Sequence, residues 1–199
     1  MKFAKKMLAL LTAVAAALMG FAGSASATTV TSPPGVSYTG HIEASSENGH
    51  IVIHFGNGIT IECGGFLTGS ITSHGAGVTA SGPITTMSFP GCTGGDTVTI
   101  VAGSAGSIEF HSIGGGNATL TSTGATVTTI DGATSVACGF TTASTHLGVV
   151  TGASTSTGHA TLDLNSAKIT RTHDSILCGT SGTWTGNYKV NTPTGLTFD

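Results

Sequence analysis

The chain has very little charge for its length of 199 residues: six lysines and arginines and nine carboxylates make up only 8% of it. Three of the six cations lie in the first six residues, and only Lys168, Arg171 and Lys189 follow residue 27. Proteins that bind nucleic acid or anionic lipid neutralise several phosphates with clustered lysines and arginines. Three scattered cations among nine carboxylates exclude both classes of partner.

Long apolar runs are missing after residue 27. The first 27 residues have the parts of a secretory signal peptide: a cationic start, an uncharged apolar stretch from Met7 to Met19, and a small-residue cleavage sequence at Ala25-Ser26-Ala27. The apolar stretch is too short for a permanent transmembrane helix. We therefore expect residues 1–27 to be a cleaved signal peptide, with no stable membrane span afterwards. The protein is then secreted, and is extracellular or bound to the cell surface.

No segment after residue 27 has the 3.6-residue apolar period of an amphipathic helix. Apolar residues instead alternate with threonine and serine, and glycines interrupt the alternation at short intervals. This pattern predicts half-buried strands joined by tight turns, with almost no helix. The strands are expected at 28–31, 50–55, 59–63, 66–71, 77–80, 84–89, 97–101, 107–113, 118–120, 125–130, 136–140, 146–150, 160–164, 167–172, 175–178, 183–190 and 196–198.

Residues 28–199 are therefore predicted to form a single secreted all-β domain. Sheets must bury their apolar faces against one another, which favours an antiparallel β-sandwich or a barrel-like sandwich. Two pseudo-repeat units, at about 50–130 and 131–199, each contain two cysteines. An outer-membrane barrel would need aromatic girdles at both bilayer interfaces, and nine aromatic residues after residue 27 are too few for them.

The four cysteines, Cys63, Cys92, Cys138 and Cys178, all follow the predicted signal peptide. An exported chain with an even number of cysteines is expected to contain disulfides, and three pairings are possible. We favour Cys63–Cys92 with Cys138–Cys178, because each bond would then close one pseudo-repeat unit. A zinc site is disfavoured because the sequence has no C-x-x-C pair.

Signatures of catalysis and of metal or cofactor binding are missing as well. His50 and His54 would share one face of a strand at roughly 13 Å, too far apart to hold one ion. The sequence has no G-x-S-x-G nucleophile motif. The triad residue types at His173-Asp174-Ser175 would point to alternate faces of a strand. We therefore expect no catalytic residues, no metal site and no cofactor, so that the protein is not an enzyme.

Two aromatic side chains are the best candidates for ligand binding. Trp184 and Tyr188 lie four residues apart on one face of the strand predicted at 183–190. If they are exposed, they form a platform on which a sugar ring could stack, as in a monomeric carbohydrate-binding or adhesin module. The alternative, which we favour, is that both rings belong to the core, because the chain has few other large side chains.

Self-association is the other route to a function. Charged residues normally protect the edges of sheets from pairing with other chains, and this chain has few charged residues. The segment 28–40 could add to the open sheet edge of a neighbouring molecule by strand addition. Extracellular polysaccharide or a hydrophobic surface is the alternative partner.

Several segments resemble a known family. The sequences TSPPGVSYTG at 31–40, ITIEC at 59–63, GSI at 69–71 and SFPGC at 88–92 are similar to secreted bacterial proteins of the PraB-like group, named as protein activators of alkane oxidation. The segment GTWTGNY at 182–188 resembles terminal strands of small secreted actinobacterial proteins of unknown function. The resemblance implies a non-catalytic extracellular protein of the cell surface, biofilm matrix or fibre-like appendages, associated with hydrophobic growth substrates. It carries over no catalytic residue.

Overall fold

The computed structural model describes residues 28–72, 79–172 and 176–199. The predicted signal peptide and the His173-Asp174-Ser175 cluster lie outside the described residues. In the described part the chain forms fourteen strands and two single-turn 3₁₀ helices, η1 (Thr93–Gly95) and η2 (Ile176–Cys178). The predicted all-β class and the near absence of helix are confirmed.

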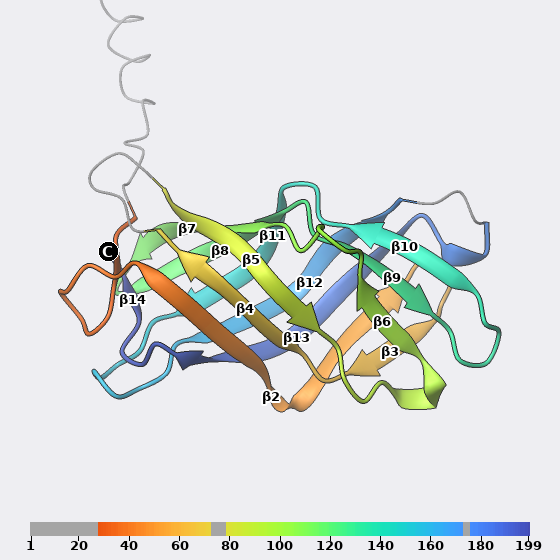
Figure 1. Ribbon diagram of the computed structural model, residues 1–199, viewed down its shortest axis with the longest axis horizontal. Helices are drawn as coiled ribbons and strands as arrows, with labels where there is room; N and C mark the ends of the chain where they lie inside the picture. The colour runs from red at the N-terminus through yellow and green to blue at the C-terminus, as the bar shows by residue number, and fades with distance from the viewer. Residues whose placement is uncertain (1–27, 73–78, 173–175) are drawn as a thin grey trace, which may run out of the picture.

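Eight antiparallel strands close into a barrel (Figure 1). Going round the wall, each strand pairs with the next, and the last pairs with the first. The wall consists, in this order, of β2 (Gly40–Phe55), β4 (Phe66–Ile71), β5 (Ala80–Ser88), β7 (Ser107–Gly114), β8 (Asn117–Thr123), β11 (Thr145–Thr151), β12 (Thr161–Arg171) and β13 (Ser181–Thr192). The barrel-like alternative of the predicted fold is the one that the chain adopts.

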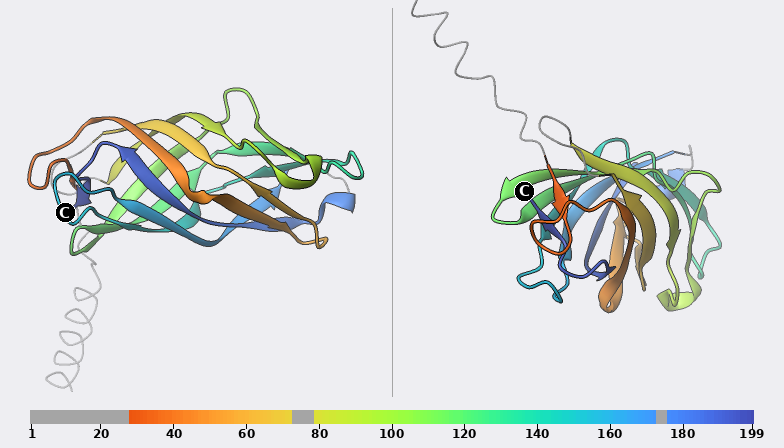
Figure 2. Two further views of the ribbon diagram at one scale, coloured as in Figure 1. Left: turned by 90° about the horizontal axis from the view of Figure 1, so that it is seen from below. Right: turned by 60° about the vertical axis from the view of Figure 1, so that its left-hand side comes forward.

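Three of these strands continue beyond the barrel and carry a second curved sheet, which makes the molecule elongated (Figure 2). The order in this extension is β3 (Thr60–Cys63), β2, β13, β12, β10 (Ala137–Thr141), β9 (Thr126–Ile130) and β6 (Thr97–Ile100). The register of the shared strands shifts where barrel and extension meet, at Glu47–His50 in β2 and at Asn165–Ser166 in β12. Such bulges bend a strand, so each long strand can serve two differently curved sheets.

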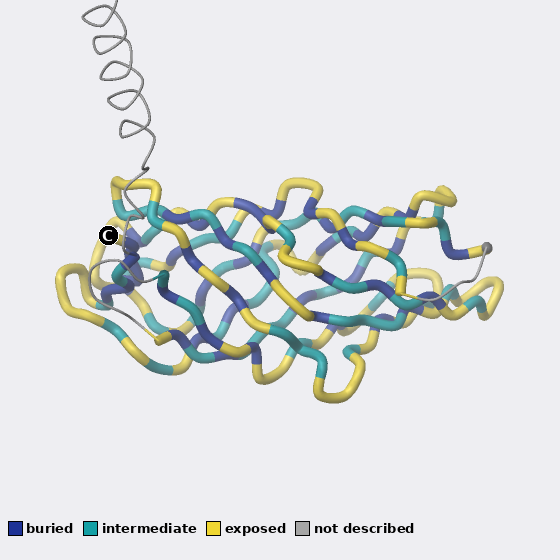
Figure 3. The backbone as a smooth tube through the Cα atoms, turned by 90° about the horizontal axis from the view of Figure 1, so that it is seen from above, coloured by how far each residue is buried: buried dark blue, intermediate teal, exposed yellow. Residues whose placement is uncertain are grey.

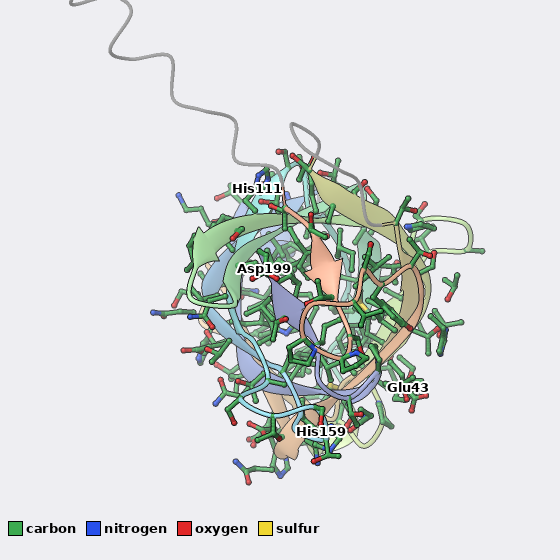
Figure 4. The ribbon with its side chains drawn as sticks, turned by 90° about the vertical axis from the view of Figure 1, so that its left-hand side faces the viewer. Glu43, His111, His159 and Asp199 are labelled. Atoms are coloured by element: carbon green, nitrogen blue, oxygen red, sulfur yellow. A yellow bond between two sulfur atoms is a disulfide. The ribbon has the colours of Figure 1, made fainter. Side chains whose placement is uncertain are left out.

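A two-stranded ribbon of β1 (Val30–Thr31) and β14 (Thr197–Phe198) lies across one end of the barrel (Figure 4). Val30 and Phe198 are completely buried, and the Phe198 ring stacks on Phe110 with 5.1 Å between centroids. The Thr28 hydroxyl accepts a hydrogen bond from the Ser112 backbone N–H at 2.7 Å. The start of segment 28–40 therefore pairs within its own chain.

The core follows from the alternation that predicts the strands. In β8, for example, Ala118, Leu120 and Ser122 are buried while the residues between them reach the outer face. Figure 3 shows the same alternation along most of the wall. In the extension, Phe55 and Phe140 stack with ring centroids 4.6 Å apart. Both parts of the molecule thus have an apolar interior.

The strand boundaries differ from the predicted ones at three places. β2 begins at Gly40, because the polar residues before His50 belong to the same strand of the barrel wall. The strand bends at Asn48 and Gly49, where φ is +57° and +79°. β5 and β12 are each continuous where the sequence predicts two strands. The strand predicted at 175–178 is wrong for the described residues, which form η2.

The predicted hairpin of 50–55 with 59–63 is confirmed, with Ile53 opposite Ile61. The two pseudo-repeat units, in contrast, do not occupy separate halves of the fold. β13 pairs with β2, β10 with β9, and β11 with β8, so strands from both units are interleaved in one sheet.

Candidate functional site

The cysteines form the pairing that the sequence favours. Cys63 is bonded to Cys92 and Cys138 to Cys178, and no cysteine is free. The first bond joins β3 to the segment that follows β5. The second joins β10 to η2. Both bonds lie in the extension, so they hold the part of the molecule whose sheet does not close.

Trp184 and Tyr188 lie in the interior. Their exposed fractions are 7% and 3%, and their rings meet edge to face with centroids 6.1 Å apart. Burial raises the pKa of the Tyr188 hydroxyl far above its ordinary value. Stacking on a sugar requires exposed ring faces, so the hypothesis of a surface platform is wrong and the core alternative is right. The packing of the barrel needs both rings in the interior.

A polar depression on the outer surface does not replace that platform. It lies between the β10–β11 turn and the bulge of β12 and has a volume of about 490 Å³. Ser144, His146, Asn165 and Lys168 are among the residues that line it, and none of its lining residues is Phe, Tyr or Trp. It therefore offers hydrogen bonds to a ligand without a face for stacking.

The barrel encloses an apolar cavity of about 50 Å³. Its lining comes from all eight wall strands, and most of it is Ile, Leu and Val. Ser122, Trp184 and Tyr188 supply the polar atoms, and the Ser122 hydroxyl is hydrogen-bonded to Thr142 at 3.0 Å. A second cavity of about 20 Å³ lies towards the extension, and Trp184 and Met87 border both.

Trp184 Nε1 is the one fully buried side-chain nitrogen or oxygen in the described residues that has no hydrogen-bond partner. An indole N–H buried in this way costs about 1–3 kcal/mol relative to one that is hydrogen-bonded. The barrel therefore holds an unused donor, on a ring that borders both cavities.

A bulge in β5 lies close to the point where the pairing of β5 with β7 ends. The register between β4 and β5 shifts at Thr85, so Thr85 and Thr86 both point outward and the Thr68 hydroxyl is hydrogen-bonded to both. As a result Ile84 and Met87, three residues apart, both contribute to the lining of the interior cavity. Two adjacent threonines break the alternation of SGPITTMSF, and this was the signal in the sequence for the bulge.

Beyond this bulge β5 loses its second neighbour. Its pairing with β7 ends at Pro83 and Ser107, and among the described residues, 86–88 pair with β4 alone. β6 follows β5 in the chain and pairs with β9 alone. A slot of about 350 Å³ lies between β5 and the end of β6 with the loop that follows it, and its lining consists of Ile84–Met87 together with Ile100, Val101, Ala102, Gly103 and Ala105. We call this feature the β5–β6 slot.

The histidines and carboxylates that the structure describes are spread over the surface. His50 lies 3.2 Å from Glu62 and His111 lies 3.7 Å from Glu109, all of them well exposed. Within the described ranges, no three His, Cys, Asp or Glu residues come together as metal ligands would. Figure 4 shows Glu43, His111, His159 and Asp199 at separate places around the capped end of the barrel.

One exposed carboxylate does have a structural role. The Thr134 hydroxyl and the Thr134 backbone N–H both donate hydrogen bonds to Asp131, at 2.7 and 2.6 Å. These bonds favour the ionised form and hold the pKa of the Asp131 carboxyl below its ordinary value. They stabilise the turn between β9 and β10 above that pKa, and protonation at lower pH removes the stabilisation.

Comparison of the chain with family models, with curated proteins and with solved structures finds no match. No helix in the described part of the chain has the length and apolar character needed to span a bilayer.

Proposed function

We propose that the protein is a non-catalytic extracellular structural subunit that self-associates by strand addition at the β5–β6 slot. The observation that carries the proposal is the pair of strand edges beside this slot, which have no pairing partner among the residues that the structure describes. A strand edge presents a row of backbone donors and acceptors, and a strand of a second copy can satisfy them.

The composition of the two edges supports this proposal. Residues 85–88 of β5 are Thr, Thr, Met and Ser, and residues 97–100 of β6 are Thr, Val, Thr and Ile. Natural sheets protect exposed edges with lysine, proline or inward-pointing charge. Neither edge has any of these devices, so nothing in the side chains opposes pairing.

The covalent structure fits a role outside the cell. Two disulfides persist in an oxidising environment and are rare in the cytosol, so they are compatible with an extracellular protein. The signal-peptide pattern of residues 1–27 points the same way. A subunit of the cell surface or biofilm matrix is the role that we infer.

The test adds a charge to each edge. The double variant Thr86→Lys/Thr99→Lys places lysines on exposed positions of β5 and β6. The matched control is Thr170→Lys, because Thr170 is also exposed but lies on β12 between two paired neighbours. We expect the oxidised wild-type protein and the control to form multimers in light scattering and electron microscopy, and the double variant to stay monomeric.

A wild-type protein that is monomeric at every concentration would refute the proposal. Multimers that persist in the double variant would refute the slot as the place of contact. Circular dichroism of each variant shows whether the β fold is intact.

A further inference from the structure

We propose that Asn48 is a site of spontaneous deamidation, in which the backbone nitrogen of Gly49 attacks the side-chain amide and converts it to a carboxylate. The same pair of residues at Asn57-Gly58 is protected by the fold. The proposal concerns the chemistry of β2 and does not rest on self-association.

The reaction consumes water and needs no enzyme and no cofactor. The Gly49 nitrogen forms a bond to Asn48 Cγ, the bond from Cγ to Nδ2 breaks, and Nδ2 leaves as ammonia with the proton of the Gly49 N–H. Water then opens the resulting succinimide ring at either carbonyl and leaves aspartate or isoaspartate, so nothing is oxidised or reduced. Glycine favours the attack because it has no Cβ to crowd the nitrogen.

The sequence places asparagine before glycine twice, at Asn48-Gly49 and at Asn57-Gly58. All four residues are exposed, and a Cβ on either glycine would have no atom within 4 Å. Sequence and exposure therefore make the two sites equally reactive. Hydrogen bonding is what distinguishes them.

Asn57 is held on both sides of the bond that would have to form. Its Nδ2 donates a hydrogen bond to the Leu177 carbonyl oxygen, and its Oδ1 accepts one from the Ile59 backbone N–H at 3.1 Å. The Gly58 N–H, which contains the attacking nitrogen, donates to the Phe55 carbonyl oxygen at 2.9 Å. Ring closure at Asn57 must break these bonds, because the attacking nitrogen and the leaving nitrogen are both hydrogen-bonded.

Asn48 lies where β2 changes its neighbours. β2 pairs with β4 as far as Ser45 and with β3 from Ile51, and its register with β13 shifts between Ser46 and Ile51. The bend between these positions thus has no strand partner among the described residues, and the Asn48 side chain has no hydrogen bond to any of them. No described residue holds this amide away from the Gly49 nitrogen.

The products change the segment that joins the barrel to the extension. Both products add a negative charge next to Glu47, and isoaspartate also adds an atom to the main chain of β2. The register shift at this bend lets β2 serve two differently curved sheets, so the added atom enters the segment that sets how they meet. Deamidation of Asn48 therefore marks the age of the molecule.

The test follows both sites in one sample of the folded protein with its two disulfides intact. The protein is incubated at mildly alkaline pH in water enriched in heavy oxygen, and its peptides are mapped by mass spectrometry over time. We expect residue 48 to take up the label about tenfold faster than residue 57, because the hydrogen bonds of Asn57 must break first. Isoaspartate should be among the products at residue 48, because it forms only through the ring.

The control is the same chain reduced and unfolded in urea, where the fold cannot protect Asn57 and both sites should react at similar rates. Freshly prepared Asn48→Asp is the second control, because it has the charge without the altered main chain. Aged wild-type protein that contains isoaspartate should melt at a lower temperature than this variant.

The proposal is overturned if the folded protein keeps its amide at residue 48, if Asn57 reacts as fast as Asn48 in the folded state, or if their difference persists in urea. Aspartate without isoaspartate would overturn the attack by Gly49. Equal melting temperatures of the aged protein and Asn48→Asp would overturn the effect on the joint between barrel and extension. None of these readouts depends on the formation of multimers.

Discussion

At the scale of single residues, the close approach of neighbouring strands depends on glycine. Gly148 of β11 lies at the seam where β11 meets β12, opposite Leu164. A Cβ at this position would be 1.8 Å from the Asp163 carbonyl oxygen. The backbone of the neighbouring strand occupies the space, and a backbone atom cannot rotate away as a side chain can.

We predict that Gly148→Ala destabilises the fold by about 3 kcal/mol, since the overpacked strand must move. The control is Gly91→Ala. Gly91 has φ of +65° and no atom within 4 Å of the place where a Cβ would lie, so it should lose only about 1 kcal/mol from its backbone conformation. Urea unfolding followed by Trp184 fluorescence gives both values. Equal losses of stability in the two variants would contradict the idea that the close approach of β11 and β12 requires glycine at position 148.

At the scale of elements, β5 has different neighbours along its length. Its first half is paired on both sides, and its second half has one free edge. The connection from β5 to β6 is attached to β3 through Cys63–Cys92. This bond therefore holds the far end of the β5–β6 slot, while Cys138–Cys178 lies on the other side of the extension.

We predict that Cys63→Ala/Cys92→Ala lowers the free energy of unfolding by about 3–4 kcal/mol, because the bond closes a loop with a sequence separation of 29. Cys138→Ala/Cys178→Ala, with a separation of 40, should lose a similar amount. Only the first variant should speed hydrogen exchange in β6 specifically. The same exchange pattern in both variants would show that the first bond does not hold the slot.

At the scale of the whole molecule, the two ends of the described chain meet across the barrel. The β1–β14 ribbon covers one opening, and its backbone hydrogen bonds continue to Thr29 and Asp199. Phe198 fills the space below it against Phe110. The barrel is thus closed at this end by segments that are far apart in the sequence.

We predict that Phe198→Ala costs about 3–5 kcal/mol of stability, the usual cost of removing a completely buried aromatic ring. Ile113→Ala at the same end of the barrel should change stability by less than about 0.5 kcal/mol, because Ile113 is 56% exposed. Thermal and denaturant unfolding measure both effects. A small loss for Phe198→Ala would mean that the ribbon is not needed to close the barrel.

The candidate sites could be predicted only in part. The disulfide pairing followed from the position of the cysteines, and the burial of Trp184 and Tyr188 was the favoured alternative. The sequence did not identify Met87 and Ser122 as residues that line the interior cavity. Alternation shows that a side chain faces inward, but it does not show which residues lie opposite it. The bulge at Thr85 had a visible signal, whereas the loss of pairing beyond it had none.

The sequence by itself determined the strand-rich class, because alternation and turn residues act over a few neighbouring positions. It also determined the scarcity of charge and the cysteine content. The tertiary structure alone decided that the sheet closes into a barrel, that the two pseudo-repeat units interleave, and that β5 and β6 remain apart although they are consecutive. These features depend on pairing between residues far apart in the chain, and a local pattern does not specify the partner of a strand.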